Sequence, residues 1–592
     1  MPTLTTAWGD ALLADPDAIP WPDHPRPMLR RERWRTLNGW WEGRVTGGDP
    51  GAPEAWSGRI RVPFPIESRL SGVQRPLGPD ETLHCRRSFT LDAPPDGRLR
   101  LHFDAVDHDC SVWLNDQPLG GHRGGNLPFC FDATAAAVAG ENRLRVEMRD
   151  ATGGFQLKGK QTLQPGRIHY SRVSGIWQSV WLEWVPDTFI ERLSVRAACS
   201  GAVTVEPKLG GTPAAPGSLR LRVTALLGGA EVASAGATVP GGEVALQIPS
   251  PRLWTPDTPT LYALRVELLD ADGAAVDRVA SHTGLRELGT APDASGRPRL
   301  TLNGQPLLHF GPLDQGWWPD GLLCPPSVEA LVSDVEFAKA AGFNTIRKHV
   351  KVEPQAFYAA CDRLGILVWQ DQPSGGPSPA WIPHRQGPDA AVPEPGGDAA
   401  WPEPEHAFWM EQWAGLVDHL DAHPCVAVWV PFNEAWGQHA SERVGAWTAA
   451  RDPSRALNIA SGGNFFPVGD VADAHRYPEP YFDFDDPRMA GFVAVVGEFG
   501  GHGLPIDGHL WSLGPRNWGY GDLPADREEL VSRYRASIEE LAALRSRGLS
   551  AGIYTQTSDV EEEINGLLTY DRRVQKIPAE TLREIHAALS GS

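Results

Sequence analysis

Two apolar runs constrain the fold more than any other feature of this 592-residue sequence. Residues 426–434 read VAVWVPFNE, and residues 492–499 read FVAVVGEF. Both are rich enough in β-branched residues to be strands buried on both faces, a pattern typical of parallel sheets covered by helices. Each run also brings a glutamate, Glu434 or Glu498, to the end of a strand, where α/β folds place their functional groups.

Segments with strand and helix patterns alternate around these two runs. Val328, Leu331, Val332 and Val335 follow a helical period, Gly342 ends it, and a strand pattern follows. We expect strands at residues 307–311, 343–349, 366–371, 426–434, 456–461, 472–477, 492–499 and 551–556. Eight such strands predict a (β/α)8 TIM barrel over residues 291–592, and we expect its fifth helix to be short or missing because little chain separates residues 461 and 475.

The first half of the chain has the period of antiparallel strands. Apolar residues alternate at 99, 101 and 103, at 112 and 114, and at 144, 146 and 148, which predicts a jelly-roll β-sandwich over residues 1–186. A second alternating block predicts an immunoglobulin-like β-sandwich over residues 187–290. One larger sandwich made of both blocks is the alternative.

Composition limits the classes of partner and compartment. A net charge of −20 disfavours nucleic acid and anionic membranes as partners, so we expect neither. The seven cysteines form no metal-binding or disulfide pattern, and the N-terminus lacks the basic and apolar regions of a signal peptide. We therefore expect a cytoplasmic protein with reduced thiols, and a homo-oligomer is left open.

The two glutamates predict chemistry at the mouth of the barrel. At the ends of the fourth and seventh strands, Glu434 and Glu498 face each other, so they can flank one glycosidic bond. Carboxyl groups about 5 to 5.5 Å apart retain the anomeric configuration, and a wider gap inverts it. A strand-end glutamate can also be a solvated loop charge.

Several motifs resemble glycoside hydrolase family 2, the group of β-galactosidases, β-glucuronidases and β-mannosidases. The resemblance covers nearly the whole chain. It rests on SGIWQSVWLE at 174–183, VWLND at 112–116, LWTPDTPTLYAL at 253–264, LNGQPLLHFG at 302–311, PFNEAWG at 431–437 and GEFGG at 497–501. It implies that Glu434 is the general acid/base, that Glu498 is the nucleophile and that Asn433 contacts the sugar 2-hydroxyl.

Other strand-end residues are candidates for substrate binding. His349, Asp371 and His475 end predicted strands, and DAHRYP at 473–478 resembles a family segment whose tyrosine, here Tyr477, binds the nucleophile. Residues 554–572, including Gln556, resemble a segment that walls the sugar site, although the acids of DVEEE at 559–563 are also compatible with a solvated helix start. Trp436 either stacks on a sugar or packs under its loop.

The resemblance implies a retaining exo-glycosidase that requires no cofactor or metal and acts on a terminal neutral, β-galactoside-like glycon. A galactofuranosidase or arabinosidase with the same mechanism remains open. A β-glucuronidase is less favoured because the Asn-x-Lys motif of family glucuronidases is missing, although Arg347, Lys348 and Arg476 lie near the rim. Outside this class, the alternatives are a non-catalytic carbohydrate-binding protein and a metal-dependent hydrolase that uses His349, Asp371 and His475.

Overall fold

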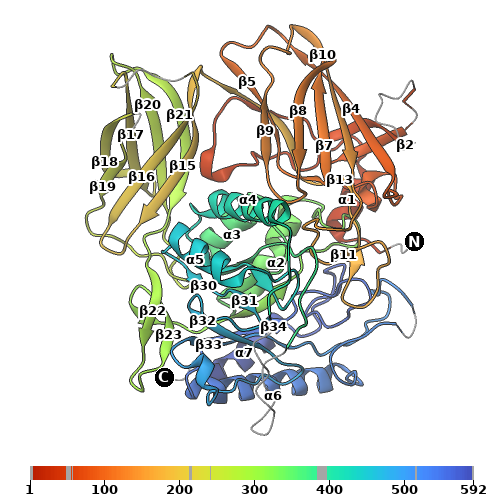
Figure 1. The fold of residues 1–592 in the computed structure, drawn as a ribbon, viewed down its shortest axis with the longest axis vertical. Coiled ribbons are helices and arrows are strands. Elements are labelled where there is room, and N and C mark those ends of the chain that lie inside the picture. The colour runs from red at the N-terminus through yellow and green to blue at the C-terminus, as the bar shows by residue number, and fades with distance from the viewer. Residues whose placement is uncertain are drawn as a thin grey trace.

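The computed structural model describes residues 4–48, 55–56, 58–212, 217–239, 242–382, 397–513 and 516–589. Two β-sandwiches lie side by side on one side of a barrel, the first coloured red to orange, the second yellow to light green, and the barrel green to blue (Figure 1). The predicted architecture of jelly roll, immunoglobulin-like sandwich and TIM barrel is confirmed.

The first sandwich packs a six-stranded sheet, in the order β3-β2-β4-β10-β7-β8, against a four-stranded sheet, in the order β1-β14-β5-β9. Leu99, Leu101 and Phe103 on β5 are buried, as their alternation predicts. The strands are β1 (Trp34–Thr36), β2 (Gly39–Gly47), β3 (Gly58–Val62), β4 (Glu81–Leu91), β5 (Arg98–Phe103), β6 (Val106–Asp107), β7 (Asp109–Leu114), β8 (Gln117–Arg123), β9 (Phe129–Asp132), β10 (Gly140–Arg149), β11 (Gln161–Thr162), β12 (Tyr170–Ser171), β13 (Gly175–Ile176) and β14 (Val180–Val185).

A short helix, α1 (Ala7–Ala14), precedes the first sandwich and was not anticipated from the sequence. The Thr6 hydroxyl accepts a hydrogen bond from the Gly9 N–H and caps the helix. The same hydroxyl and the Thr6 N–H each donate to Asp320 of the barrel at 2.8 Å. A helix of eight residues is marginal alone, so this contact with the barrel stabilises it.

The second sandwich has its own core, separate from that of the first, so the alternative of one larger sandwich is wrong. Its sheets run β15-β16-β19 and β18-β17-β20-β21, and a small sheet, β22-β23-β24, follows. The strands are β15 (Thr188–Ala197), β16 (Ala202–Gly211), β17 (Leu219–Leu227), β18 (Ala230–Val239), β19 (Val244–Gln247), β20 (Tyr262–Leu269), β21 (Ala275–Thr283), β22 (Leu288–Pro292), β23 (Pro298–Leu302) and β24 (Gln305–Pro306).

Eight parallel strands form the barrel sheet in the order β30-β28-β27-β26-β25-β34-β33-β32. All eight predicted strands are present within a few residues. They are β25 (His309–Asp314), β26 (Thr345–Lys348), β27 (Leu367–Asp371), β28 (Val426–Val430), β30 (Ala456–Leu457), β32 (Val471–His475), β33 (Val493–Gly500) and β34 (Ala551–Thr555). The fourth and fifth strands continue as a second parallel pair, β29 (Phe432–Asn433) and β31 (Ala460–Ser461).

The barrel helices are α2 (Val328–Ala340), α3 (Gln355–Leu364), α4 (Glu403–Leu420), α5 (Ser441–Arg451), α6 (Arg527–Ser546) and α7 (Ala579–His586). The chain passes from β31 to β32 without a helix, which confirms the prediction for the fifth repeat. The sixth repeat also departs from the ideal, because only a 3-10 turn (Pro487–Met489) joins β32 to β33. Within the described residues, no helix has the length and apolar character needed to cross a membrane.

Candidate active site

Glu434 and Glu498 meet at the mouth of the barrel, together with His475. One oxygen of each carboxylate and one ring nitrogen of His475 all lie within 4.8 Å of one another. His475 Nδ1 is 3.2 Å from Glu434 Oε1 and 3.5 Å from Glu498 Oε2. Glu434 directly follows β29 at a φ of 51°, and its N–H donates to the Ser461 carbonyl of β31 at 2.7 Å. The parallel register of the barrel thus brings together two acids that are distant in sequence.

Arg347, at the end of β26, connects the groups around Glu498. Its guanidinium donates to both oxygens of Asp371 at 3.1 and 3.0 Å, to Glu498 Oε1 at 3.1 Å and to Asn433 Oδ1 at 2.8 Å. Burial opposes its charge, but Asp371 and Glu498 outweigh burial and raise its pKa. Asp371 has no exposed surface and positions Arg347, and the ligand contact expected from the sequence stays a prediction.

The surroundings of Glu498 favour its ionised form. Burial alone would raise its pKa, but His475, Arg347 and His349 outweigh burial and lower the pKa to about 2. The Tyr477 hydroxyl donates to Glu498 Oε2 at 2.6 Å. Burial and the charge of Glu498 raise the pKa of Tyr477 well above its ordinary value, so the phenol remains a donor.

Two imidazoles flank Glu498 in different charge states. Burial would lower the pKa of His475, but Glu498 and Glu434 outweigh it and raise that pKa, which favours the imidazolium. His349 Nδ1 lies 3.1 Å from Asp371 Oδ2 and 4.0 Å from Glu498 Oε1. Burial and the nearby charge of Lys160 lower the pKa of His349 well below its ordinary value, the direction opposite to that of His475.

The remaining candidates, Trp436 and Gln556, are positioned differently from each other. Trp436 is half-buried and stacks on His169 of the first sandwich, with ring centroids 5.4 Å apart. Gln556 has no exposed surface, and its Nε2 donates to Asn565 Oδ1 at 2.7 Å. Trp436 therefore forms part of the wall between domains. Gln556 supports the loop after β34, and its expected ligand contact stays a prediction.

Sequence patterns missed the residues that reach the site from loops. Tyr520 stacks on Tyr477 with ring centroids 3.5 Å apart, and Lys160 comes from the first sandwich. Both lie in segments without periodicity. The alternative of a solvated helix start at 559–563 is wrong. Glu561 accepts from the Ser171 N–H at 2.9 Å, Glu563 binds the Tyr170 hydroxyl, and burial raises the pKa of Glu561 to about 7. These acids tie the first sandwich to the barrel.

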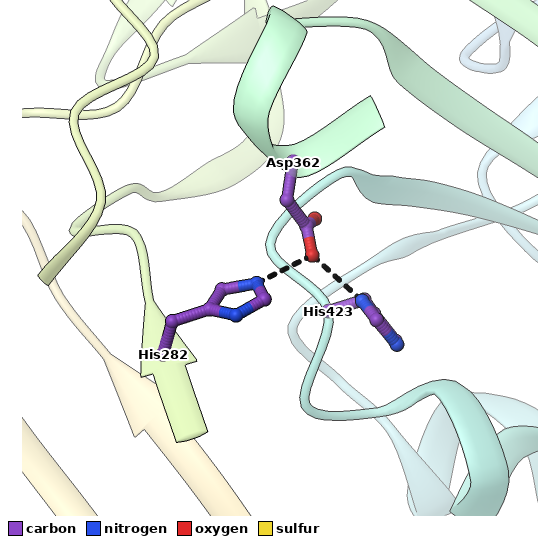
Figure 2. A group of neighbouring side chains, drawn as sticks. All are labelled: His282, Asp362 and His423. Atoms are coloured by element: carbon purple, nitrogen blue, oxygen red, sulfur yellow. Dashed lines mark hydrogen bonds and ion pairs between the residues drawn. The ribbon is translucent and has the colours of Figure 1, made fainter. Parts of the chain in front are cut away.

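A second cluster of potential metal ligands joins the second sandwich to the barrel. Figure 2 shows Asp362 between His282 of β21 and His423, which follows α4. Asp362 Oδ2 lies 2.8 Å from His282 Nε2 and 2.6 Å from His423 Nδ1. Two ligands of one tetrahedral zinc ion, each about 2.1 Å from it, would lie about 3.4 Å apart, so these distances fit hydrogen bonds better.

Large cavities lie elsewhere. One of about 610 Å³ between the second sandwich and the barrel is lined in part by Arg286, and another of about 400 Å³ beside the first sandwich is lined in part by Glu183. Neither is lined by Glu434 or Glu498. The candidate site is therefore identified by the chemistry at the strand ends and not by the size of a cavity.

Family models agree with the two sandwiches. Residues 34–186 match the sugar-binding domain of glycosyl hydrolases family 2, and residues 188–286 match the domain that follows it in that family. The two sandwiches therefore match two successive domains of glycosyl hydrolases family 2. The resemblance stated from the sequence motifs is thereby confirmed, and these matches cover the two sandwiches.

The sequence is also similar to those of β-galactosidases. It is 28% identical over 465 residues to the β-galactosidase of Aeromonas hydrophila subsp. hydrophila, covering 74% of this chain and 42% of that protein. It is 25% identical over 494 residues to the β-galactosidase of Erwinia tasmaniensis, covering 76% and 45%. The chain thus spans less than half the length of these relatives.

Solved structures share the fold across nearly the full chain. A β-glucuronidase from Ruminococcus gnavus in complex with D-glucaro-d-lactam has a TM-score of 0.73 at 18% identity, covering 94% of this chain and 98% of that one. A family 2 β-galacturonidase from Eisenbergiella tayi has a TM-score of 0.69 at 19% identity, covering 95% and 97%. At these identities the likeness concerns the fold alone.

Proposed function

We propose that the protein is a retaining exo-glycosidase that hydrolyses a terminal β-glycoside by double displacement. The observation that carries the proposal is the approach of Glu434 and Glu498 to within 4.8 Å at the ends of two barrel strands. That spacing suits a nucleophile and an acid/base that act on the same anomeric carbon, and it leaves too little room for the intervening water of an inverting enzyme.

In the first step, the Glu498 carboxylate attacks the anomeric carbon and the bond to the leaving oxygen breaks. Glu434 gives its proton to that oxygen, which leaves a glycosyl ester on Glu498 and a carboxylate on Glu434. In the second step, Glu434 takes a proton from water, the water oxygen attacks the anomeric carbon, and the ester bond to Glu498 breaks. The sugar leaves with its configuration retained and both glutamates return to their starting states.

The contacts of the two glutamates support different roles. Arg347 and Tyr477 donate to Glu498, and together with His475 they stabilise the negative charge that a nucleophile needs. The Glu434 side chain is 14% exposed and that of Glu498 is 7% exposed. Glu434 is therefore the more accessible of the two to a leaving group and to water. Asn433 is held by Arg347, and its amide N–H remains to donate to a sugar hydroxyl.

The wall made by the first sandwich supports action at a chain end. His169 and Lys160 lie against Trp436, two residues after the acid/base candidate. The relatives differ in the sugar that their names specify. The sequence relatives are named β-galactosidases, and the structural neighbours are named β-glucuronidases and a β-galacturonidase. The neutral, galactoside-like glycon expected from the sequence stays a prediction.

Replacement of the nucleophile candidate tests the proposal. On nitrophenyl β-glycosides of the hexoses and of their uronic acids, Glu498→Ala should lose all measurable turnover, and azide should restore it with a glycosyl azide of inverted configuration. Glu528→Ala, at an exposed position on α6, is the matched control and should retain full activity. Normal turnover by Glu498→Ala would overturn the nucleophile assignment, and a wild type inert on every glycoside would favour the carbohydrate-binding alternative.

A further inference from the structure

Lys160 of the first sandwich is a buried lysine whose ammonium group faces aromatic rings and no carboxylate. Its residue is 8% exposed, and its Nζ lies 5.4 Å from the ring centre of Tyr170 and 5.8 Å from that of Trp436. Within the described part of the chain, its ammonium has no hydrogen bond or ion pair. The ammonium is therefore available to an anionic ligand, because its neighbours within the described residues are ring faces.

The other buried lysines of the described residues are all paired. Lys348 donates to Asp314 and Glu353 at 2.7 Å, Lys351 lies 2.7 Å from the same Glu353, and Lys576 donates to Asp559 at 2.6 Å. The fold therefore supplies a carboxylate wherever it buries a lysine for structural reasons. Lys160 is the exception to that rule.

The backbone holds Lys160 at the mouth of the barrel. The N–H groups of Lys158 and Gly159 donate to the Ser374 carbonyl, which follows β27, at 3.0 and 2.8 Å. Gly159 has a φ of 57°, and a Cβ there would lie 2.7 Å from the Val350 carbonyl oxygen, so this approach requires glycine. The loop is fixed between the ends of two barrel strands.

Lys160 lies close to both halves of the candidate site. Its loop contacts the carbonyls of Ser374 and Val350, which follow the strands that carry Asp371 and Arg347. Its Nζ lies over the ring of Trp436, two residues after Glu434, and its charge helps to lower the pKa of His349. From this position the ammonium can reach a sugar bound at the barrel mouth.

We propose that Lys160 binds a carboxylate carried by the glycon, so that the substrate of this chain is a β-D-uronide. This inference rests on the proposed glycosidase function and competes with the neutral glycon expected from the sequence. A carboxylate carries one negative charge, which one ammonium matches, whereas a phosphate group would call for several donors. The recognition comes from the first sandwich, in a loop that packs on the barrel.

Binding of hydrolytically inert thioglycosides tests this assignment without relying on turnover. Calorimetry would compare phenyl 1-thio-β-D-glucuronide and galacturonide with the matching glucoside and galactoside. The wild type should bind a uronide at least tenfold more tightly than its neutral counterpart, and Lys160→Met should lose that preference while still binding the neutral sugar. Lys158→Met is the matched control, because its Nζ donates to the Thr152 carbonyl at 3.3 Å, and it should keep the preference.

Three results would overturn the assignment: a wild type that binds no uronide, equal binding of uronide and hexoside, or a preference that survives in Lys160→Met. A preference for a 6-phosphoglucoside over the uronides would equally exclude the carboxylate. Lys160→Gln provides a second neutral variant if the methionine variant does not fold. Loss of the uronide preference leaves the Glu498→Ala result unaffected, so failure of this inference and failure of the proposed chemistry remain distinguishable.

Discussion

Two clusters of acids and imidazoles occupy very different places in this molecule. At the barrel mouth, Glu434, His475 and Glu498 bring their ligating atoms within 4.8 Å of one another, and at the interface between the second sandwich and the barrel, His282 and His423 do the same around Asp362. The first cluster has two acids and one imidazole, and the second has one acid and two imidazoles (Figure 2). Both clusters consist of acids and imidazoles, so their residue types alone do not show which of them is catalytic.

The two clusters differ in how many of the hydrogen-bond acceptors of each acid have partners within the protein. Asp362 accepts hydrogen bonds from both histidines through Oδ2 and from the Cys425 N–H through Oδ1, and it has no exposed surface. Glu434 has His475 as its side-chain partner and keeps some exposure. A satisfied acid holds two domains together, whereas an incompletely satisfied one at an open rim remains available for proton transfer.

The largest expected effect concerns Arg347. Arg347→Met removes the donor shared by Glu498, Asn433 and Asp371, so kcat/KM should fall at least about 100-fold, as it does when one preorganised donor to a reacting group is lost. Arg347→Lys keeps the positive charge but loses the bidentate guanidinium, so its kcat/KM should fall less than that of Arg347→Met. Steady-state kinetics on the best glycoside measures both. Near wild-type activity of the methionine variant would contradict the role assigned to this arginine.

At the interface cluster the expected effect is on stability and not on activity. Asp362→Asn removes a buried charge shared by two histidines, which should lower the unfolding free energy by about 3 kcal/mol and leave kcat unchanged. Denaturant unfolding measures the loss. Asp421→Asn is the control, because Asp421 lies at the same interface but is partly exposed and should cost less. A drop in kcat without a loss of stability would contradict the structural role of Asp362 and indicate that this cluster also contributes to the reaction.

The pH dependence of that loss has a definite sign. Burial would raise the pKa of Asp362, but His423 and His282 outweigh burial and hold it below its ordinary value. Its ionised form therefore stabilises the fold above the pKa of the unfolded aspartate, and this contribution fades as the pH falls through the folded value. The gap between wild type and Asp362→Asn should be widest near neutral pH and narrow in acid.

A smaller effect is expected on the acid limb of the reaction. Among the groups that lower the pKa of Glu498 against the effect of burial, His475 has the largest effect. His475→Asn should therefore raise that pKa by about one unit or more. Inactivation by a 2-deoxy-2-fluoroglycosyl fluoride reports on the nucleophile alone, and its acid limb should move to higher pH in the variant. An unmoved limb would assign the low pKa of Glu498 to the groups other than His475, chiefly Arg347.

The smallest expected effect is that of a chelator. The separations around Asp362 are too short for two ligands of one zinc ion, so EDTA should leave the melting temperature unchanged. A reaction carried out by two glutamates needs no metal, so kcat should not change either. Activity and thermal unfolding before and after dialysis against EDTA check this. A lower melting temperature that zinc restores would instead identify the cluster around Asp362 as a metal centre.

Most of the fold could be predicted from the periodicity of apolar residues and from the polar residues at strand ends. The apolar runs ending near Glu434 and Glu498 could be placed in a parallel barrel because strands buried on both faces leave few other arrangements. The missing fifth helix followed from the short chain between residues 461 and 475. The sixth repeat was not anticipated, because a 3-10 turn leaves no periodic signal in so short a segment.

By itself, then, the sequence determined the three-part architecture and the pair of glutamates, since both depend on local patterns and on a regular topology. Only the tertiary structure decided what surrounds those glutamates. Arg347 could be interpreted as a rim charge until its hydrogen-bond acceptors were placed around it, and Lys160 lies in an aperiodic loop of another domain. Charge and burial at a site are properties of contacts between distant segments, which no local pattern encodes.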